Sequence, residues 1–333
     1  MARTILVMHP GALGDVLLAI PAIQQLRAHI PGCTIACAVQ ESIGSFLLRC
    51  GVIDVWMSIE GPEIADLFAG SVSCGSRLDE LLRQCDVCVI WLKDEHQAIR
   101  RVLERYGVRQ ISIRSPFDEG LQARHQRDRF MEIIGETGLP PCETTRWKLP
   151  AEIVQLGREC LLRHGLCPEH PLVMIHPGSG SRLKCIKPNV LADTIMQLQT
   201  DGLQCCVLEG PADQETAESL ARCVQRPISV IKGMDISTVA GILSHTTLYI
   251  GHDSGVTHLS GLIGVQTLAM FGPTNPEQWA PKGPHVKVVR GMPCICLSWE
   301  EVRRCKEKPC LAIQSDQLLD VCRSIEEMAN SSL

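Results

Sequence analysis

Short apolar runs alternate with amphipathic segments along most of the chain. The runs have the length and the β-branched content of buried strands, and they cover residues 4–8, 34–39, 54–57, 86–92, 110–113, 172–175, 204–208, 228–231, 248–250 and 266–271. Apolar residues at helical spacing lie between them, for example in residues 16–29, 98–106, 190–200, 214–223 and 237–243. This alternation predicts an α/β fold in which helices cover both faces of parallel sheets.

The alternation pauses once, at residues 139–150, where three prolines exclude a continuous helix. It then restarts, and a length of 333 residues suits two domains of about 150 residues each. We therefore expect two doubly wound, Rossmann-like domains, at residues 1–150 and 151–314. Residues 315–333 carry Leu318, Leu319 and Cys322 at helical spacing, which predicts a closing helix.

Composition and charge exclude several classes of protein. A net charge of −5 and a pI near 6.1 argue against a dedicated nucleic-acid-binding protein. No apolar run reaches the roughly 18 residues that a membrane span needs. The apolar stretch at the N-terminus is too short for a signal peptide, so the sequence predicts a cytoplasmic protein.

Eighteen cysteines are many for such a chain. Cys85, Cys88, Cys205 and Cys206 lie in predicted strands, which favours reduced thiols packed as small apolar side chains over a redox pair at Cys85 and Cys88.

A second group of cysteines crowds residues 294–310. Four thiolates can hold zinc or iron, and the group consists of Cys294, Cys296, Cys305 and Cys310. Their spacing is irregular compared with a pair of C-x-x-C motifs, which favours an interpretation without metal and leaves the question open.

The first loop that carries chemistry follows the first predicted strand and opens a helix. Gly11 and Gly14 allow a close approach of the backbone, and Asp15 lies at the helix start. The G-x-x-G spacing lacks the dinucleotide fingerprint, which argues against a nicotinamide site. Asp15 is either an ordinary acidic residue of the first helical turn or a general base, and this loop alone favours the former.

The second loop, residues 176–184, follows the strand predicted at 172–175. Gly178 and Gly180 free the backbone, Ser179 and Ser181 add hydroxyl groups, and Lys184 adds a positive charge. This composition suits a phosphate or diphosphate, although the motif is not a Walker loop and a plain surface turn is the alternative.

The third loop, residues 251–259, leads from a strand into a helix. Asp253 and Ser254 are good helix caps, and Gly255 leaves the first backbone N–H groups uncovered, so the helix start attracts an anion. His258 lies one turn further on the same face. The alternatives are an ordinary cap for Asp253 and a core histidine for His258.

Together these loops resemble glycosyltransferase family 9, the ADP-heptose:lipopolysaccharide heptosyltransferases. The resemblance rests on residues 11–22, 176–181, 251–258 and 271–281, which follow the family's order and spacing. It implies a GT-B fold, in which two Rossmann-like domains face across a cleft, and an inverting transfer without metal or other cofactor. It further implies that the N-terminal domain binds a lipopolysaccharide-core or related cell-envelope acceptor and that the C-terminal domain binds a nucleotide-sugar.

The resemblance also assigns roles to residues. Asp15 corresponds to the base, on an acceptor loop with Gly11 and Gly14. The donor-binding residues are then Ser179, Gly180, Ser181 and Lys184 near the phosphates, Glu209 at the ribose, Met234 at the adenine, and Asp253, Ser254, Gly255 and His258 at the diphosphate and sugar. Trp279 is one candidate for stacking on a sugar.

Other functions stay open at this point. They are a glycosyltransferase of the same fold that uses another nucleotide-sugar and acceptor, and a non-catalytic sugar-nucleotide-binding protein. Residues 93–129 carry nine basic and six acidic side chains. This excess fits a solvated face, and the sharper hypothesis is a surface for an anionic glycolipid, with peripheral contact at the cytoplasmic face of the inner membrane.

Overall fold

A computed structural model describes residues 3–117, 124–137 and 147–330, with side chains up to residue 323. The chain divides into two compact units, Met1–Arg146 and Trp147–Leu333, and each is described here by itself. The predicted linker, residues 139–150, lies mostly outside the described residues. Its last residue, Pro150, directly precedes the first helix of the second unit.

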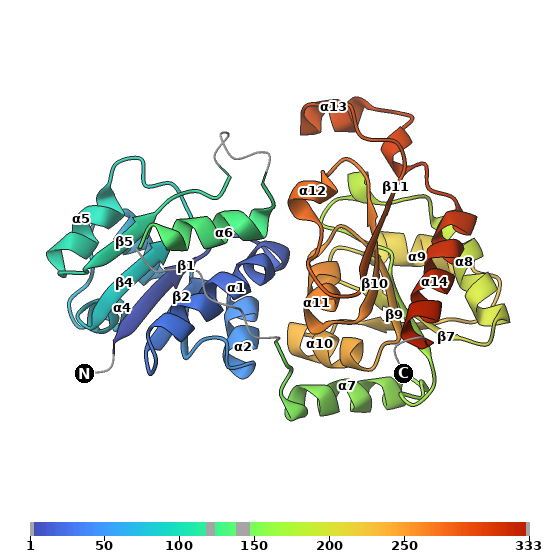
Figure 1. Cartoon of the computed structure of the whole chain (residues 1–333), viewed down its shortest axis with the longest axis horizontal. Coiled ribbons are helices and arrows are strands. Elements are labelled where there is room, and N and C mark those ends of the chain that lie inside the picture. Colours follow the sequence, from blue (N-terminus) through green and yellow to red (C-terminus); the bar gives the residue numbers. More distant parts are fainter. Residues whose placement is uncertain (1–2, 118–123, 138–146, 331–333) are drawn as a thin grey trace. The chain divides into compact units, whose positions relative to one another are not determined.

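The N-terminal unit is a parallel sheet of five strands in the order β3-β2-β1-β4-β5 (Figure 1). The strands are β1 (Thr4–Met8), β2 (Thr34–Val39), β3 (Val55–Ser58), β4 (Cys85–Ile90) and β5 (Gln110–Ile113). The helices are α1 (Leu13–His29), α2 (Glu41–Arg49), α3 (Pro62–Phe68), α4 (Arg77–Leu82), α5 (Ala98–Arg105) and α6 (Gln126–Gly135). All five residues of β1 are buried, because helices cover both faces of this central strand.

The C-terminal unit is a parallel sheet of six strands in the order β11-β10-β9-β6-β7-β8. The strands are β6 (Leu172–His176), β7 (Gln204–Glu209), β8 (Ser229–Lys232), β9 (Leu248–His252), β10 (Gln266–Phe271) and β11 (Val286–Arg290). The helices are α7 (Ala151–Arg163), α8 (Pro188–Thr200), α9 (Gln214–Cys223), α10 (Ile236–Ser244), α11 (Gly255–Ile263), α12 (Pro276–Trp279), α13 (Trp299–Arg304) and α14 (Ser315–Asn330).

Both strand orders are those of the Rossmann fold, so the predicted fold class is confirmed. In such sheets the strand order reverses between two neighbouring strands, and ligands bind beyond the carboxyl ends of that pair. The pair is β1 and β4 in the first unit and β6 and β9 in the second.

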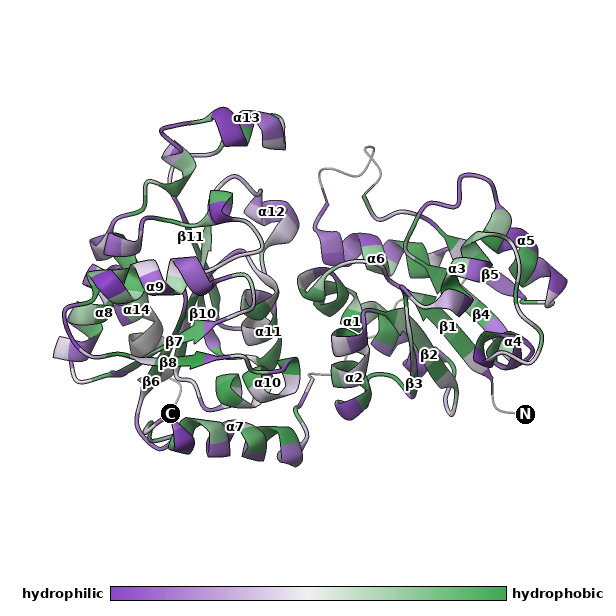
Figure 2. Cartoon of the chain, turned by 180° about the vertical axis from the view of Figure 1, so that it is seen from behind, coloured by the Kyte–Doolittle hydropathy of each residue, from purple (hydrophilic) through white to green (hydrophobic). Residues whose placement is uncertain are grey.

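Most strands begin or end within two residues of their predicted bounds, because they are buried apolar runs. Figure 2 shows these strands in green, with purple concentrated on helices and loops. The edge strand β11 was not predicted. It reads Val-Lys-Val-Val-Arg, and its side chains are exposed or half-buried, so it lacks the continuous apolar run of a central strand.

The final described helix, α14, packs against α8, β10 and β11 of the C-terminal unit. Leu318 and Cys322 face its core, which is the face that the helical spacing predicted. Among the described residues, no helix is both long and apolar enough to cross a membrane.

Candidate functional site

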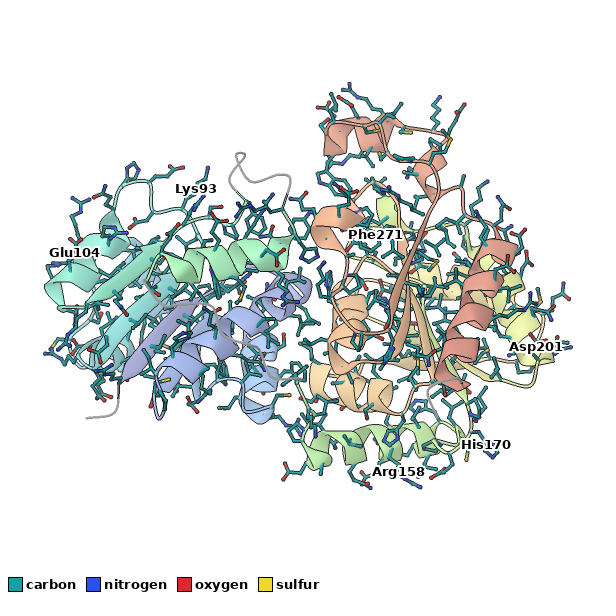
Figure 3. The ribbon with its side chains drawn as sticks, in the orientation of Figure 1. Lys93, Glu104, Arg158, His170, Asp201 and Phe271 are labelled. Atoms are coloured by element: carbon teal, nitrogen blue, oxygen red, sulfur yellow. The ribbon has the colours of Figure 1, made fainter. Side chains whose placement is uncertain are left out.

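Two loops of the C-terminal unit meet beyond the carboxyl ends of the neighbouring strands β6 and β9. In Figure 3, Phe271, the last residue of β10, marks the end of the sheet at which the strands finish. The Ser179 hydroxyl donates a hydrogen bond of 2.7 Å to the Asp253 backbone carbonyl. Lys184 Nζ lies 2.7 Å from Asp253 Oδ2. The second and third predicted loops therefore form one site at the switch point of this sheet.

Lys184 and Asp253 form a partly buried ion pair in this site. The side chain of Asp253 is 8% exposed, and that of Lys184 is 21% exposed. Asp253 does not cap the following helix, because Ser254 is its N-cap residue. A bound anion would compete with the Asp253 carboxylate for the Lys184 ammonium group.

The start of α11 adds backbone donors to the site. Ser254 is the N-cap, and its hydroxyl accepts a hydrogen bond from the Thr257 N–H group. Gly255 is the first helical residue and has no side chain to cover its own N–H group or that of Val256. These groups and the helix dipole favour an anion. His258 is buried one turn on, with Nε2 4.0 Å from Asp253 Oδ1.

A buried histidine–aspartate pair supports these loops, and sequence reasoning missed it. His176 Nε2 lies 2.8 Å from Asp213 Oδ2, and His176 Nδ1 lies 3.3 Å from the Ser254 hydroxyl. A side chain at position 178 would collide with the Asp213 carboxylate, so Gly178 is needed for this close approach.

The Asp213 carboxylate stays ionised despite its burial. Burial alone would raise its pKa, but the hydrogen bond and charge of His176 and the Gly210 N–H group outweigh burial and hold the pKa below its ordinary value. One signal for this residue was available in the sequence: Asp213 lies just past the end of β7, beside Gly210 and Pro211.

The remaining residues of the second loop differ in their contacts. Ser181 is the N-cap of a short 3-10 helix, Arg182–Lys184, and its hydroxyl accepts from the Leu183 N–H group. Gly180 is exposed and has open space around it. Its backbone is thus accessible to a ligand, whereas the Ser179 hydroxyl is already used to join the two loops.

Glu209 and Met234 lie further along the same edge. Glu209 is the last residue of β7, and Met234 follows β8; both are half-buried. With the strand order β9-β6-β7-β8, the candidate residues run from the start of α11 past Lys184 to Glu209 and then Met234. Four neighbouring strands span about 14 Å between the outer two.

The first predicted loop lies at the corresponding switch point of the N-terminal unit. Asp15 is half-buried in the first turn of α1, where one carboxylate oxygen accepts from the Ala12 N–H group at 3.2 Å. Gly14 lies in the same turn. A side chain at position 11 would collide with His9 and Asp15, which explains Gly11. Asp15 thus has the helix-start contact of the ordinary interpretation, in a position that also suits a base.

The cysteines of the described residues are free thiols. Burial raises the pKa of Cys85 to about 11 and that of Cys88 well above its ordinary value, which suits packing rather than redox chemistry.

In the 294–310 group, desolvation and the neighbouring thiols of Cys294 and Cys305 raise the pKa of Cys296 to about 11. Within the part of the chain that the structure describes, no three or more His, Cys, Asp or Glu side chains are arranged to hold a metal ion.

The basic segment, residues 93–129, is described except for residues 118–123. Several of its charges have partners: Arg114 pairs with Glu136, Arg124 with Glu132 and Arg109 with Asp86. Arg129 is buried and donates to the Pro116 carbonyl. These pairs favour the solvated-face interpretation.

Comparisons with known proteins agree with the observed fold. The sequence profile of glycosyltransferase family 9 (heptosyltransferase) matches residues 146–310. No curated protein sequence matches the chain.

Among solved structures, a glycosyl transferase family 9 protein from Veillonella parvula is 19% identical, with a TM-score of 0.81 over 97% of both chains. ADP-heptose LPS heptosyltransferase II of E. coli is 15% identical, with a TM-score of 0.76 over 98% of this chain and 100% of that one. E. coli heptosyltransferase WaaC with ADP is also 15% identical, with a TM-score of 0.66 over 97% and 100%. At such identities the likeness establishes the fold.

The fold is therefore that of GT-B-type glycosyltransferases, with two Rossmann-like domains. Within that class, the C-terminal unit is similar to glycosyltransferase family 9 (heptosyltransferase), whose profile it matches.

Proposed function

We propose that the chain is an inverting glycosyltransferase that moves a heptose from ADP-heptose to a lipopolysaccharide core or related cell-envelope acceptor. The observation that carries the proposal is the pairing of Lys184 with Asp253 beside the start of α11, at the switch point of the C-terminal sheet. A lysine ammonium group and uncovered helical N–H groups, brought together in one place, suit a diphosphate.

The nucleotide part of the donor would extend along the sheet edge. In this proposal the diphosphate lies at Lys184, Ser254 and Gly255, the ribose at Glu209, and the adenine at Met234. A ribose hydroxyl donates well to a carboxylate, and a thioether packs on a flat aromatic base. The names of the similar E. coli structures, which include ADP-heptose and ADP, support an adenine nucleotide.

The chemistry follows from where charge develops. The departing nucleoside diphosphate gains negative charge, which Lys184 and the N–H groups of α11 stabilise. An acceptor hydroxyl is a weak nucleophile at neutral pH, so a base is needed, and we assign that role to Asp15. A single displacement by that hydroxyl inverts the configuration at the sugar carbon. No metal or other cofactor has a step in this scheme.

A panel of ADP-, UDP-, GDP- and CDP-sugars in calorimetric titrations tests the donor. We expect ADP-heptose to bind most tightly and Met234→Ala to weaken ADP-heptose and free ADP by similar factors, because both contain adenine. Tighter binding of a UDP- or GDP-sugar would replace the proposed donor with that of another glycosyltransferase of this fold.

Transfer itself needs a separate assay with cell-envelope glycolipid as acceptor. Appearance of the inverted product supports the enzyme. Tight donor binding without transfer or donor hydrolysis would instead indicate a sugar-nucleotide-binding protein. We place the reaction at the cytoplasmic face of the inner membrane, where such an acceptor would be reached by peripheral contact.

A further inference from the structure

A lobe at residues 291–311 leaves the C-terminal sheet after β11 and returns to its starting point. The Gly291 N–H group donates to the Cys310 carbonyl, and the Met292 N–H group donates to the Pro309 carbonyl. A side chain at position 291 would lie 2.3 Å from the Pro309 carbonyl oxygen, so this closure needs a glycine. Figure 1 shows α13, which lies within this lobe, held out from the body of the unit.

The lobe contacts the candidate donor site through the side chain of Trp299. Trp299 is the first residue of α13, and Ser298 caps this helix by accepting from the Glu301 N–H group. Lys184 Nζ lies over the Trp299 ring, 5.7 Å from its centroid. This is a cation–π contact, and the same ammonium group is bonded to Asp253.

The indole is well suited to meet a ligand. It is 46% exposed, so a large part of its surface is open beside a charged group. Two other large apolar side chains of the lobe, Ile295 and Leu297, are more exposed, at 86% and 93%. Trp299, by contrast, lies against the Lys184 ammonium group.

We propose that Trp299 contacts the donor where its sugar joins the diphosphate and thereby favours the nucleotide-sugar over the free nucleoside diphosphate. The apolar C–H faces of a sugar ring pack well on an indole, and the electron-rich ring face also holds the Lys184 ammonium group toward the phosphates. This role rests on the proposed function, because it assumes a nucleotide-sugar at Lys184. The sequence had suggested Trp279 for sugar stacking; the contact with Lys184 favours Trp299.

The test compares two ligands and three variants. Calorimetric titrations measure ADP-heptose and ADP binding to the parent, Trp299→Ala, Trp299→Phe and Leu297→Ala. We expect Trp299→Ala to weaken ADP-heptose about tenfold and ADP about threefold or less, since a cation–π or aromatic contact corresponds to roughly two- to thirtyfold in affinity. Trp299→Phe should retain most of the affinity. Leu297→Ala, on the same lobe, should leave both ligands unchanged.

Tryptophan fluorescence distinguishes a direct contact between Trp299 and the donor from a purely structural role of Trp299. Adding ADP-heptose to the parent should change the tryptophan emission, and this change should be lost in Trp299→Phe, although four other tryptophans remain. Unchanged affinities in Trp299→Ala would overturn the proposal. Equal losses for both ligands together with a lower melting temperature would also overturn it, because they would indicate a structural role only.

The proposed function fails in a different way. If the parent prefers another nucleotide-sugar, the adenine donor is wrong, and Trp299 is judged with that nucleotide-sugar and its own nucleoside diphosphate. If the parent binds none of the panel, both proposals are wrong.

Discussion

The tripeptide His-Pro-Gly lies at the end of the first strand of both units: residues 9–11 directly follow β1, and residues 176–178 begin with the last residue of β6. His9 packs against Trp91 and Phe130, with ring centroids 5.5 Å and 5.1 Å away. Its Nδ1 accepts from the Gly11 N–H group, and burial lowers its pKa to about 3. His176 lies instead between a carboxylate and a hydroxyl group.

The difference shows that the side chains around the His-Pro-Gly tripeptide determine what its histidine can do chemically. In the N-terminal unit the aromatic surroundings keep the histidine neutral, and the only candidate group of this loop is the acid Asp15. In the C-terminal unit the histidine holds Asp213 and Ser254, and the loop ends in the cation Lys184. The two loops thus present opposite charges, which suits a base in one unit and an anion site in the other.

The largest expected effect concerns Asp15, which follows β1 in the first turn of α1. Asp15→Asn keeps the size of the side chain and the contact to the Ala12 N–H group, so the fold should survive. Loss of a positioned base should lower the transfer rate by about 10²–10⁴, while donor affinity stays within about threefold, because the donor residues belong to the other unit. Steady-state kinetics and donor titrations check this. Transfer at a tenth of the parent rate or better would remove Asp15 from the mechanism.

The next largest effect concerns His176, the histidine with polar partners. His176→Leu would leave the Asp213 carboxylate buried without its main partner, so we expect a loss of about 3–5 kcal/mol in the free energy of unfolding. Donor affinity should fall as well, since Ser254 loses a contact. Urea denaturation measures the first effect. A loss below about 1 kcal/mol would show that this pair does not support the site.

The matched substitution in the other unit should be milder. His9→Leu fits the apolar surroundings and leaves only the Gly11 N–H group without its acceptor, so we expect a loss of about 1–2 kcal/mol. The same denaturation experiment applies to both variants. Equal losses at positions 9 and 176 would contradict the contrast drawn between the two loops.

The effect of acid on stability tests the apolar surroundings of His9 and should be smaller. The pKa of His9 in the folded state, about 3, lies below the value of about 6.5 in the unfolded chain. The unfolded state therefore binds more protons between these values, and stability that is present above pH 6.5 is lost as the pH falls. His9→Leu should reduce this loss by up to about 1.4 kcal/mol per pH unit between pH 6 and 4.

His252 contributes to the acid loss in the same direction, because burial lowers its pKa to about 4. The variant should therefore keep part of the slope. An unchanged slope in His9→Leu would mean that His9 is not held neutral by the fold.

Much of the fold could be predicted from the sequence, because buried parallel strands are continuous apolar runs that end at turn residues. Predicted strands 4–8, 34–39, 110–113 and 266–271 agree with the structure at both ends. The edge strand β11 was missed because its Lys287 and Arg290 interrupt the apolar run. The sequence also indicated the loops after β1, β6 and β9, since Gly, Ser and charged residues directly follow strands there.

The sequence could not provide contacts between distant segments. Trp299 meets Lys184 only because the 291–311 lobe is closed on itself, and Asp213 meets His176 only because β6 and β7 are neighbours. The sequence could not identify the N-cap residue of α11 for a similar reason. Asp253 and Ser254 are equally good caps by residue type, but Ser254 is the N-cap and the Asp253 carboxylate pairs with the distant Lys184.

If the joined loops after β6 and β9 bind the donor diphosphate through Lys184, removal of this lysine should weaken donor binding, which a titration measures. ADP-heptose is titrated into the parent, Lys184→Ala and Lys187→Ala, the last removing an exposed lysine three residues away. Loss of a charge-assisted contact should weaken binding to Lys184→Ala by roughly ten- to a hundredfold, whereas Lys187→Ala should stay within about twofold. Equal affinity in the parent and Lys184→Ala, with ADP-heptose bound by both, would contradict binding through Lys184 and put the diphosphate elsewhere.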